Sequence, residues 1–136
     1  MNIAGGHVEV ITRRRRGQRE FRLHLLERFG EMCAFSGEQP AEVLEAAHVV
    51  SFAKTGLHDR NGGLLLRRDF HTLFDRHLMT VNPSTWQIEV APSLSKFETY
   101  RGISGNELLV EARYRPRTEI LQAHYVESQS VFEIAG

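Results

Sequence analysis

The spacing of apolar positions predicts a helix near the start of the chain. Over residues 18–32, Phe21 and Leu25 recur at the spacing of one helical face, and Gly30 is well suited to end the helix. Residues 1–16 contain two adjacent glycines and four consecutive arginines but little periodicity. We therefore expect them to form a flexible, basic N-terminus.

The middle of the chain predicts two strands and a helix in close succession. Residues 43–52 are rich in strand-forming residues, and the polar, glycine-bearing stretch 53–63 predicts a loop. Three leucines then predict a short buried strand, after which Asp69 is placed to cap a helix over 70–78. The residues expected in the core of this unit are Leu64, Leu65, Leu66, Phe70, Leu73, Phe74 and Leu78.

The remainder of the chain predicts a hairpin and a last helix. Two runs rich in strand-forming residues flank an Asn-Pro-Ser-Thr turn over 78–90, and Pro116 is placed to open a helix over 117–132. The length of 136 residues suits one domain. Because short strands and helices mix without strand–helix–strand alternation, we expect the α+β class and a single domain over 1–136.

The chain is neutral overall, but its charge is unevenly distributed. The formal net charge is zero, yet the segment from Arg13 to Arg28 holds seven arginines and two glutamates. A polyanion responds to this local excess rather than to the average. The arginines expected to contact nucleic acid are Arg13, Arg14, Arg15, Arg16, Arg67 and Arg68.

Composition also limits the location and the chemistry. No apolar run approaches the ~20 residues that span a bilayer, and the first residues lack the apolar core of a secretory signal. A cytoplasmic location without membrane contact is therefore expected. Cys33 is the single cysteine, which excludes an intrachain disulfide and a structural zinc site built from several cysteines.

Four polar residues of the central unit could form a catalytic site. His48 could act as a general base, because the free pKa of histidine lies near neutral pH. His71 and Asp75 are four residues apart on the predicted helix and could hold a divalent cation through one nitrogen and one oxygen. The side-chain amide of Asn61 could brace the loop. Such a set of side chains suits hydrolysis of a phosphodiester.

The order His48, Asn61, His71 resembles the HNH nuclease motif. The segments "LEAAHVVSF" and "NGGLLLRRDFHTLFD" are similar, in order and spacing, to the HNH endonuclease family of bacterial restriction systems. The resemblance covers residues 17–126 and implies a ββα-metal (His-Me finger) core over 43–79. It further implies metal-dependent cleavage of double-stranded DNA in restriction or phage defence, with His48 as the base. Mg²⁺ is the expected ion, with Mn²⁺, Ni²⁺ and Zn²⁺ as alternatives.

Three departures from the family pattern bear on the site. Ala47 stands where many relatives place an acidic or histidine metal ligand, so the second ligand must be Asp75 or, as the alternative, Glu45. Two glycines follow Asn61 where one is usual, which could displace its bracing role by one position. Ser36 stands where a second zinc-binding cysteine would be, so no structural zinc is expected.

Two other functions stay open at this stage. The missing acidic neighbour at Ala47 is compatible with an HNH-like module that binds nucleic acid or a protein without cutting. A toxin nuclease effector, with an immunity protein as its partner, is the other alternative. For a restriction-type enzyme of this size, recognition of the target would require a homodimer or a fused or associated specificity domain.

Overall fold

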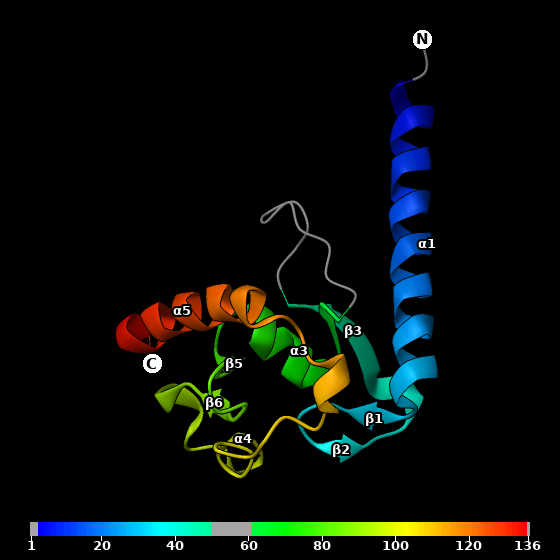
Figure 1. The fold of residues 1–136 in the computed structure, drawn as a ribbon. Helices are drawn as coiled ribbons and strands as arrows, with labels where there is room; N and C mark the ends of the chain where they lie inside the picture. Colours follow the sequence, from blue (N-terminus) through cyan, green and yellow to red (C-terminus); the bar gives the residue numbers. More distant parts are fainter. Residues whose placement is uncertain (1–2, 50–60, 136) are drawn as a thin grey trace.

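The computed structural model describes the backbone of residues 3–49 and 61–135 (Figure 1). Within these ranges, side chains are described at Thr12 and from Arg15 to Ile134. The elements, in chain order and apart from single 3₁₀ turns, are α1 (Ile3–Phe29), β1 (Met32–Cys33), β2 (Gly37–Glu38), β3 (Leu44–His48), β4 (Gly63–Arg67), α3 (Arg68–Asp75), β5 (Met79–Val81), β6 (Ile88–Val90), α4 (Glu98–Arg101) and α5 (Thr118–Ala135).

The antiparallel hairpin of β3 and β4 lies at the centre of the fold. Its register pairs Ala46 with Leu65 and His48 with Gly63. α1 packs against both strands, and α3 follows β4 directly and packs against the hairpin as well (Figure 1). The three leucines of β4 are at most 1% exposed, and each contributes about 1.5–3 kcal/mol by burial. The arrangement fixes the end of β3 relative to α3.

The N-terminal helix is longer than the sequence indicated. α1 begins at Ile3, so residues 3–16, for which the sequence indicated no helix, are helical. Arginine is a good helix former, and a helix whose C-terminal end is packed extends readily through such residues. The predicted end is confirmed, because Gly30 has a φ of +72° and its N–H bonds to the carbonyl of Leu26 at 2.8 Å.

Helix α3 differs from the prediction at both ends. It begins at Arg68, and Asp69 does not cap it but lies inside the first turn, paired with Arg67 at 2.7 Å. The helix ends at Asp75 rather than 78, because the N–H of Leu78 returns to the carbonyl of Leu73 at 2.9 Å. His77 adopts a φ of +60° in this turn, a backbone conformation that usually belongs to glycine at a helix end.

The remaining elements agree with the predicted class. β5 and β6 form the expected antiparallel hairpin, and α5 begins two residues after Pro116 and packs against β5. Small antiparallel sheets with helices on both sides confirm the α+β class.

The predicted core is confirmed, with Leu73 and Leu78 partly buried at its edge. The predicted strand over 43–52 is confirmed for 44–48, while 50–60 lie outside the described residues. None of the helices in the described ranges has the length and apolar character needed to cross a bilayer.

Candidate active site

His48 is the last residue of β3, and its ring is held against α1. The ring stacks on Phe21 with centroids 4.1 Å apart and planes 12° from parallel. Partial burial lowers the pKa of His48 below its ordinary value, while the charge of Asp75 raises it and that of His71 lowers it. Burial is the largest of these effects. At neutral pH the ring is therefore neutral, as a general base requires.

The second glycine of the Asn-Gly-Gly sequence has a steric reason. Gly63 lies opposite His48 in the hairpin, and a Cβ atom at this position would lie 2.4 Å from the Phe21 ring. Only glycine leaves room for the stack on His48. α1 therefore contributes to the site through Phe21. The sequence predicted only that Phe21 lies on the apolar face of a helix.

His71 lies between two carboxylates. Its Nδ1 atom is 2.8 Å from Glu45 Oε1 of β3, and its Nε2 atom is 3.1 Å from Asp75 Oδ2 of the same helix. The side chain is 23% exposed, so both contacts are partly shielded from water. Arg68 also reaches Glu45, at 3.3 Å. The structure therefore brings both candidate second ligands to the same imidazole.

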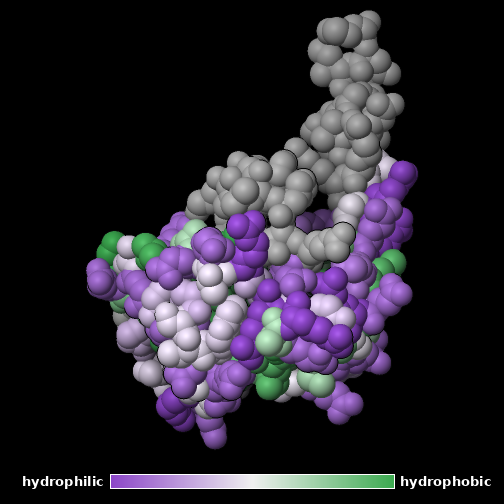
Figure 2. Space-filling view, in the orientation of Figure 1, coloured by the Kyte–Doolittle hydropathy of each residue, from purple (hydrophilic) through white to green (hydrophobic). Residues whose placement is uncertain are grey.

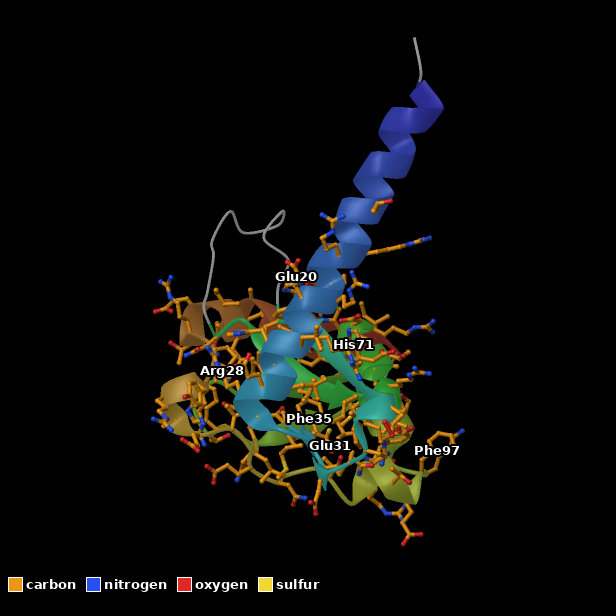
Figure 3. All side chains as sticks on the ribbon, turned by 90° about the vertical axis from the view of Figure 1, so that its right-hand side faces the viewer. Glu20, Arg28, Glu31, Phe35, His71 and Phe97 are labelled. Carbon is orange, nitrogen blue, oxygen red and sulfur yellow. The ribbon has the colours of Figure 1, made fainter. Side chains whose placement is uncertain are left out.

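The two carboxylates face different hollows. A cleft of about 410 Å³ is lined by His48, His71 and Asp75, with residues of α5 on its other wall. Glu45 lines a neighbouring hollow of about 370 Å³, which His71 shares and which side chains of α1 also line. Figure 3 shows the labelled His71 next to α1. The Asp75 side of His71 is thus the side that shares a cleft with His48.

Asn61 makes the contacts of a bracing residue. Its Oδ1 accepts a hydrogen bond from Arg28 Nη1 at 3.0 Å, and its Nδ2 donates to the backbone carbonyl of Arg113 at 2.9 Å. The first contact ties the approach to β4 to α1, and the second ties it to the segment before α5. The sequence placed Asn61 correctly at the start of the second strand, but these partners are 33 and 52 residues away.

The donor set can be tested against a divalent cation. In the part of the chain that the structure describes, no group of three or more His, Cys, Asp and Glu side chains is arranged to hold a metal. His71 Nε2 and Asp75 supply a nitrogen and an anionic oxygen, a pair that fits Mg²⁺ weakly and Mn²⁺, Ni²⁺ or Zn²⁺ better. Glu45 on Nδ1 then matches the carboxylate that orients many metal-binding histidines. The residues fit a cation with two protein ligands.

His124 of α5, for which the sequence favours a surface or packing role, is a buried packing residue. It is 4% exposed, and its ring stacks on Phe74 of α3 at 3.8 Å. Its Nε2 lies 2.8 Å from the Phe74 carbonyl, and its Nδ1 lies 2.7 Å from Thr80 Oγ1. His124 thereby ties α5 to the C-terminal end of α3. No sequence signal was available, because the partners are 44 and 50 residues distant.

The predicted DNA-contacting arginines differ in their surroundings. Arg67 forms two short contacts with Asp69, at 2.7 and 2.8 Å, and Tyr100 donates to the same carboxylate. Arg68 is 69% exposed beside the site. Arg15 and Arg16 are exposed on α1, whose described surface is strongly hydrophilic (Figure 2). The predicted contacts of the Arg13 and Arg14 side chains lie outside the described residues.

Comparison with known families confirms the resemblance. Residues 33–82 match the family model described as HNH endonuclease. No curated protein matches the chain. The matched range runs from β1 to β5 and includes His48, Asn61, His71 and Asp75, whereas α1 and α5 lie outside it. The match to this model suggests nuclease activity, together with the nucleic-acid binding and the divalent metal that are general in the matched family.

Proposed function

We propose that the protein is a metal-dependent endonuclease that hydrolyses phosphodiester bonds of double-stranded DNA. The observation that carries this proposal is the shared cleft of His48, His71 and Asp75 inside the matched HNH domain. The β3–β4 hairpin followed by α3 serves as its ββα-metal core. By analogy with the family, we place the activity in restriction or phage defence.

His48 is the general base of the proposed reaction. Its ring is fixed by the stack on Phe21, and its lowered pKa keeps Nε2 or Nδ1 free to take a proton from the attacking water. A positioned base of this kind contributes about 10²- to 10⁴-fold to the rate. Asn61 supports the reaction indirectly by holding the approach to β4 against α1.

His71 and Asp75 hold the divalent cation in this proposal. A bound cation would neutralise charge that develops on the phosphate and stabilise the leaving oxygen. The pairing of Glu45 with Nδ1 leaves Nε2 facing the cleft, which favours Asp75 over Glu45 as the second ligand. The mixed nitrogen and oxygen donors accept Mg²⁺, the expected cellular ion, and also Mn²⁺, Ni²⁺ and Zn²⁺.

The proposed substrate is double-stranded DNA held mainly through its phosphates. Arg15, Arg16 and Arg68 are exposed near the site or on α1, while the ion pair with Asp69 favours a structural role for Arg67. Arg13 and Arg14 extend the basic run by sequence. Target recognition is assigned to a second copy or to a specificity domain.

A plasmid assay tests the proposal directly. Supercoiled DNA is incubated with the wild-type protein and Mg²⁺, Mn²⁺, Ni²⁺ or Zn²⁺, with EDTA as the control. We expect nicked or linear product with at least one metal and none with EDTA. His48→Ala should lose about 10²-fold or more of that activity while keeping its circular dichroism spectrum. Full activity in this variant would remove His48 from the mechanism.

The second candidate function is binding of nucleic acid without cleavage. It is favoured by Ala47 and by the lack of a group of three or more metal-binding side chains among the described residues. DNA binding without product in every metal would establish it. A toxin effector differs in having an immunity protein, which would inhibit cleavage when added to the same assay.

A further inference from the structure

Helix α1 extends well beyond the surface on which it packs. Its 27 residues span about 40 Å, and its N-terminal part projects away from the rest of the molecule (Figures 1 and 3). All described side chains from Arg15 to Glu20 are exposed. The first residue of the helix that is partly buried is Phe21, among those whose side chains are described.

The segment of α1 from Arg13 to Glu20 is cationic and contains no apolar residue. From Arg13 to Glu20 the sequence holds five arginines and one glutamate. A helical segment without apolar residues gains little by packing on another protein core. A polyanion complements it, because phosphates neutralise neighbouring arginines that otherwise repel one another.

The arginines of the described part share one face. Arg15 and Arg16 lie four and three residues before Arg19, so all three are neighbours on the helix surface. Together with Thr12 they line a hollow of about 230 Å³. The described arginines of this segment therefore bring their guanidinium groups together on one face.

This arginine face continues to the hollow that adjoins the His48 cleft at His71. Arg19 also lines the hollow that contains Glu45 and His71. Arg22, about one turn further along the helix, has a structural role. Its guanidinium donates hydrogen bonds to the backbone carbonyls of Ala41 and Leu44 and so anchors α1 beside β3. Arg19 therefore lies where the arginine face meets the hollow that contains Glu45 and His71.

We propose that Arg15, Arg16 and Arg19 form a phosphate-binding arm that holds the DNA duplex on one side of the bond to be cut. This inference rests on the proposed function, because DNA reaching the His48 cleft is what places a duplex beside α1. From Arg15 to Arg19 the helix rises about 6 Å, close to two base steps of duplex. The contacts are to phosphates, so the arm acts on any sequence.

Salt-dependent binding tests the arm without requiring cleavage. A labelled duplex is titrated with the full chain carrying His48→Ala, and with the same chain carrying Arg15→Ala and Arg19→Ala in addition. We expect the slope of log affinity against log salt to fall by about 0.9 for each lost contact, or about 1.8 for both. Alanine keeps the helix, which circular dichroism verifies.

The matched control removes two exposed charges elsewhere. Lys96→Ala with Arg101→Ala changes the net charge equally, on and before α4. This variant should keep the wild-type slope. Equal slopes in all three proteins, or equal losses in both double variants, would overturn the arm. Dimers by light scattering that dissociate only in the arm variant would also overturn it, in favour of pairing between copies.

The arm and the nuclease proposal fail separately. Suppose that the plasmid assay gives no product with any metal, but the slope of log affinity against log salt is reduced in the arm variant. The arm proposal is then supported and the cleavage proposal is wrong. If cleavage occurs and the slope is unchanged, the reverse holds. A length series sharpens the result: duplexes truncated on one side of the cut should lose affinity in the His48→Ala chain but not in its arm variant.

Discussion

His71 and His124 have the same side chain in opposite surroundings. His71 has a carboxylate at each ring nitrogen and is 23% exposed on the cleft. His124 is 4% exposed, meets a backbone carbonyl and a hydroxyl, and stacks on an aromatic ring. Negative partners and access to solvent suit a cation ligand, whereas neutral partners and burial suit a structural lock. Partner charge therefore separates the two roles better than residue type.

Removing each ring in turn gives the largest expected contrast. His71→Gln should lower the cleavage rate by more than about 100-fold. Even residues that only hydrogen-bond to a metal ligand typically lower activity by about 10- to 100-fold when they are replaced. The His71→Gln change should leave the melting temperature nearly unchanged. His124→Ala should cost about 2–4 kcal/mol of unfolding free energy, because it leaves a cavity and removes the hydrogen bond to the buried Thr80 hydroxyl.

Plasmid cleavage and urea unfolding measure the two losses in both variants. Val126→Ala on the exposed face of α5 is the control, because its side chain is 54% exposed. If His124→Ala keeps full stability but loses activity, the comparison is wrong and His124 belongs with the catalytic residues.

The next contrast separates the two carboxylates on His71. Asp75→Asn should weaken Mn²⁺ binding by more than about 100-fold as the loss of a ligand, while Glu45→Gln should weaken it by about 10- to 100-fold as the loss of an orienting partner. Calorimetry with Mn²⁺ measures both affinities. The reverse order would make Glu45 the ligand and Asp75 the orienting group.

The smallest predicted effect is a shift in the pH dependence. The base must be neutral, so activity falls as pH drops through the pKa of His48. Burial lowers this pKa, and the acidic limb should lie below the ordinary value of about 6.5. Phe21→Ala removes the stacked ring and exposes His48 further, which should move the limb of kcat/KM to higher pH. An unmoved limb would show that the stack on Phe21 does not set this pKa.

The local patterns predicted most of the central unit and less of its surroundings. The leucines of β4, the glycine end of α1 and the hairpin after α3 follow from spacing and turn chemistry. The start of α1 could not be predicted, because arginine propensity extends a helix that only its far end stabilises. Asp69 was misread as a cap because its stronger partner, Arg67, comes two residues earlier and draws it away.

The candidate site shows the same division between local and distant information. His48, Asn61, His71 and Asp75 were located from their order and spacing along the chain. Phe21 and His124 depend on contacts between segments far apart in sequence, which no single local pattern encodes. The two glycines after Asn61 lie between these cases. Their position was visible in the sequence, but the reason for the second one, Gly63, is its contact with the ring of Phe21, which only the fold shows.

The way in which the chain leaves and rejoins the central hairpin has a consequence for His48. The N–H of Val49 bonds to the carbonyl of Gly62 at 2.9 Å, one step beyond the pair of His48 and Gly63. Asn61 then secures the returning strand to α1. The two strand ends beside His48 are therefore held together by contacts among described residues. The hairpin and α1 thus set the position of His48 at the mouth of the cleft.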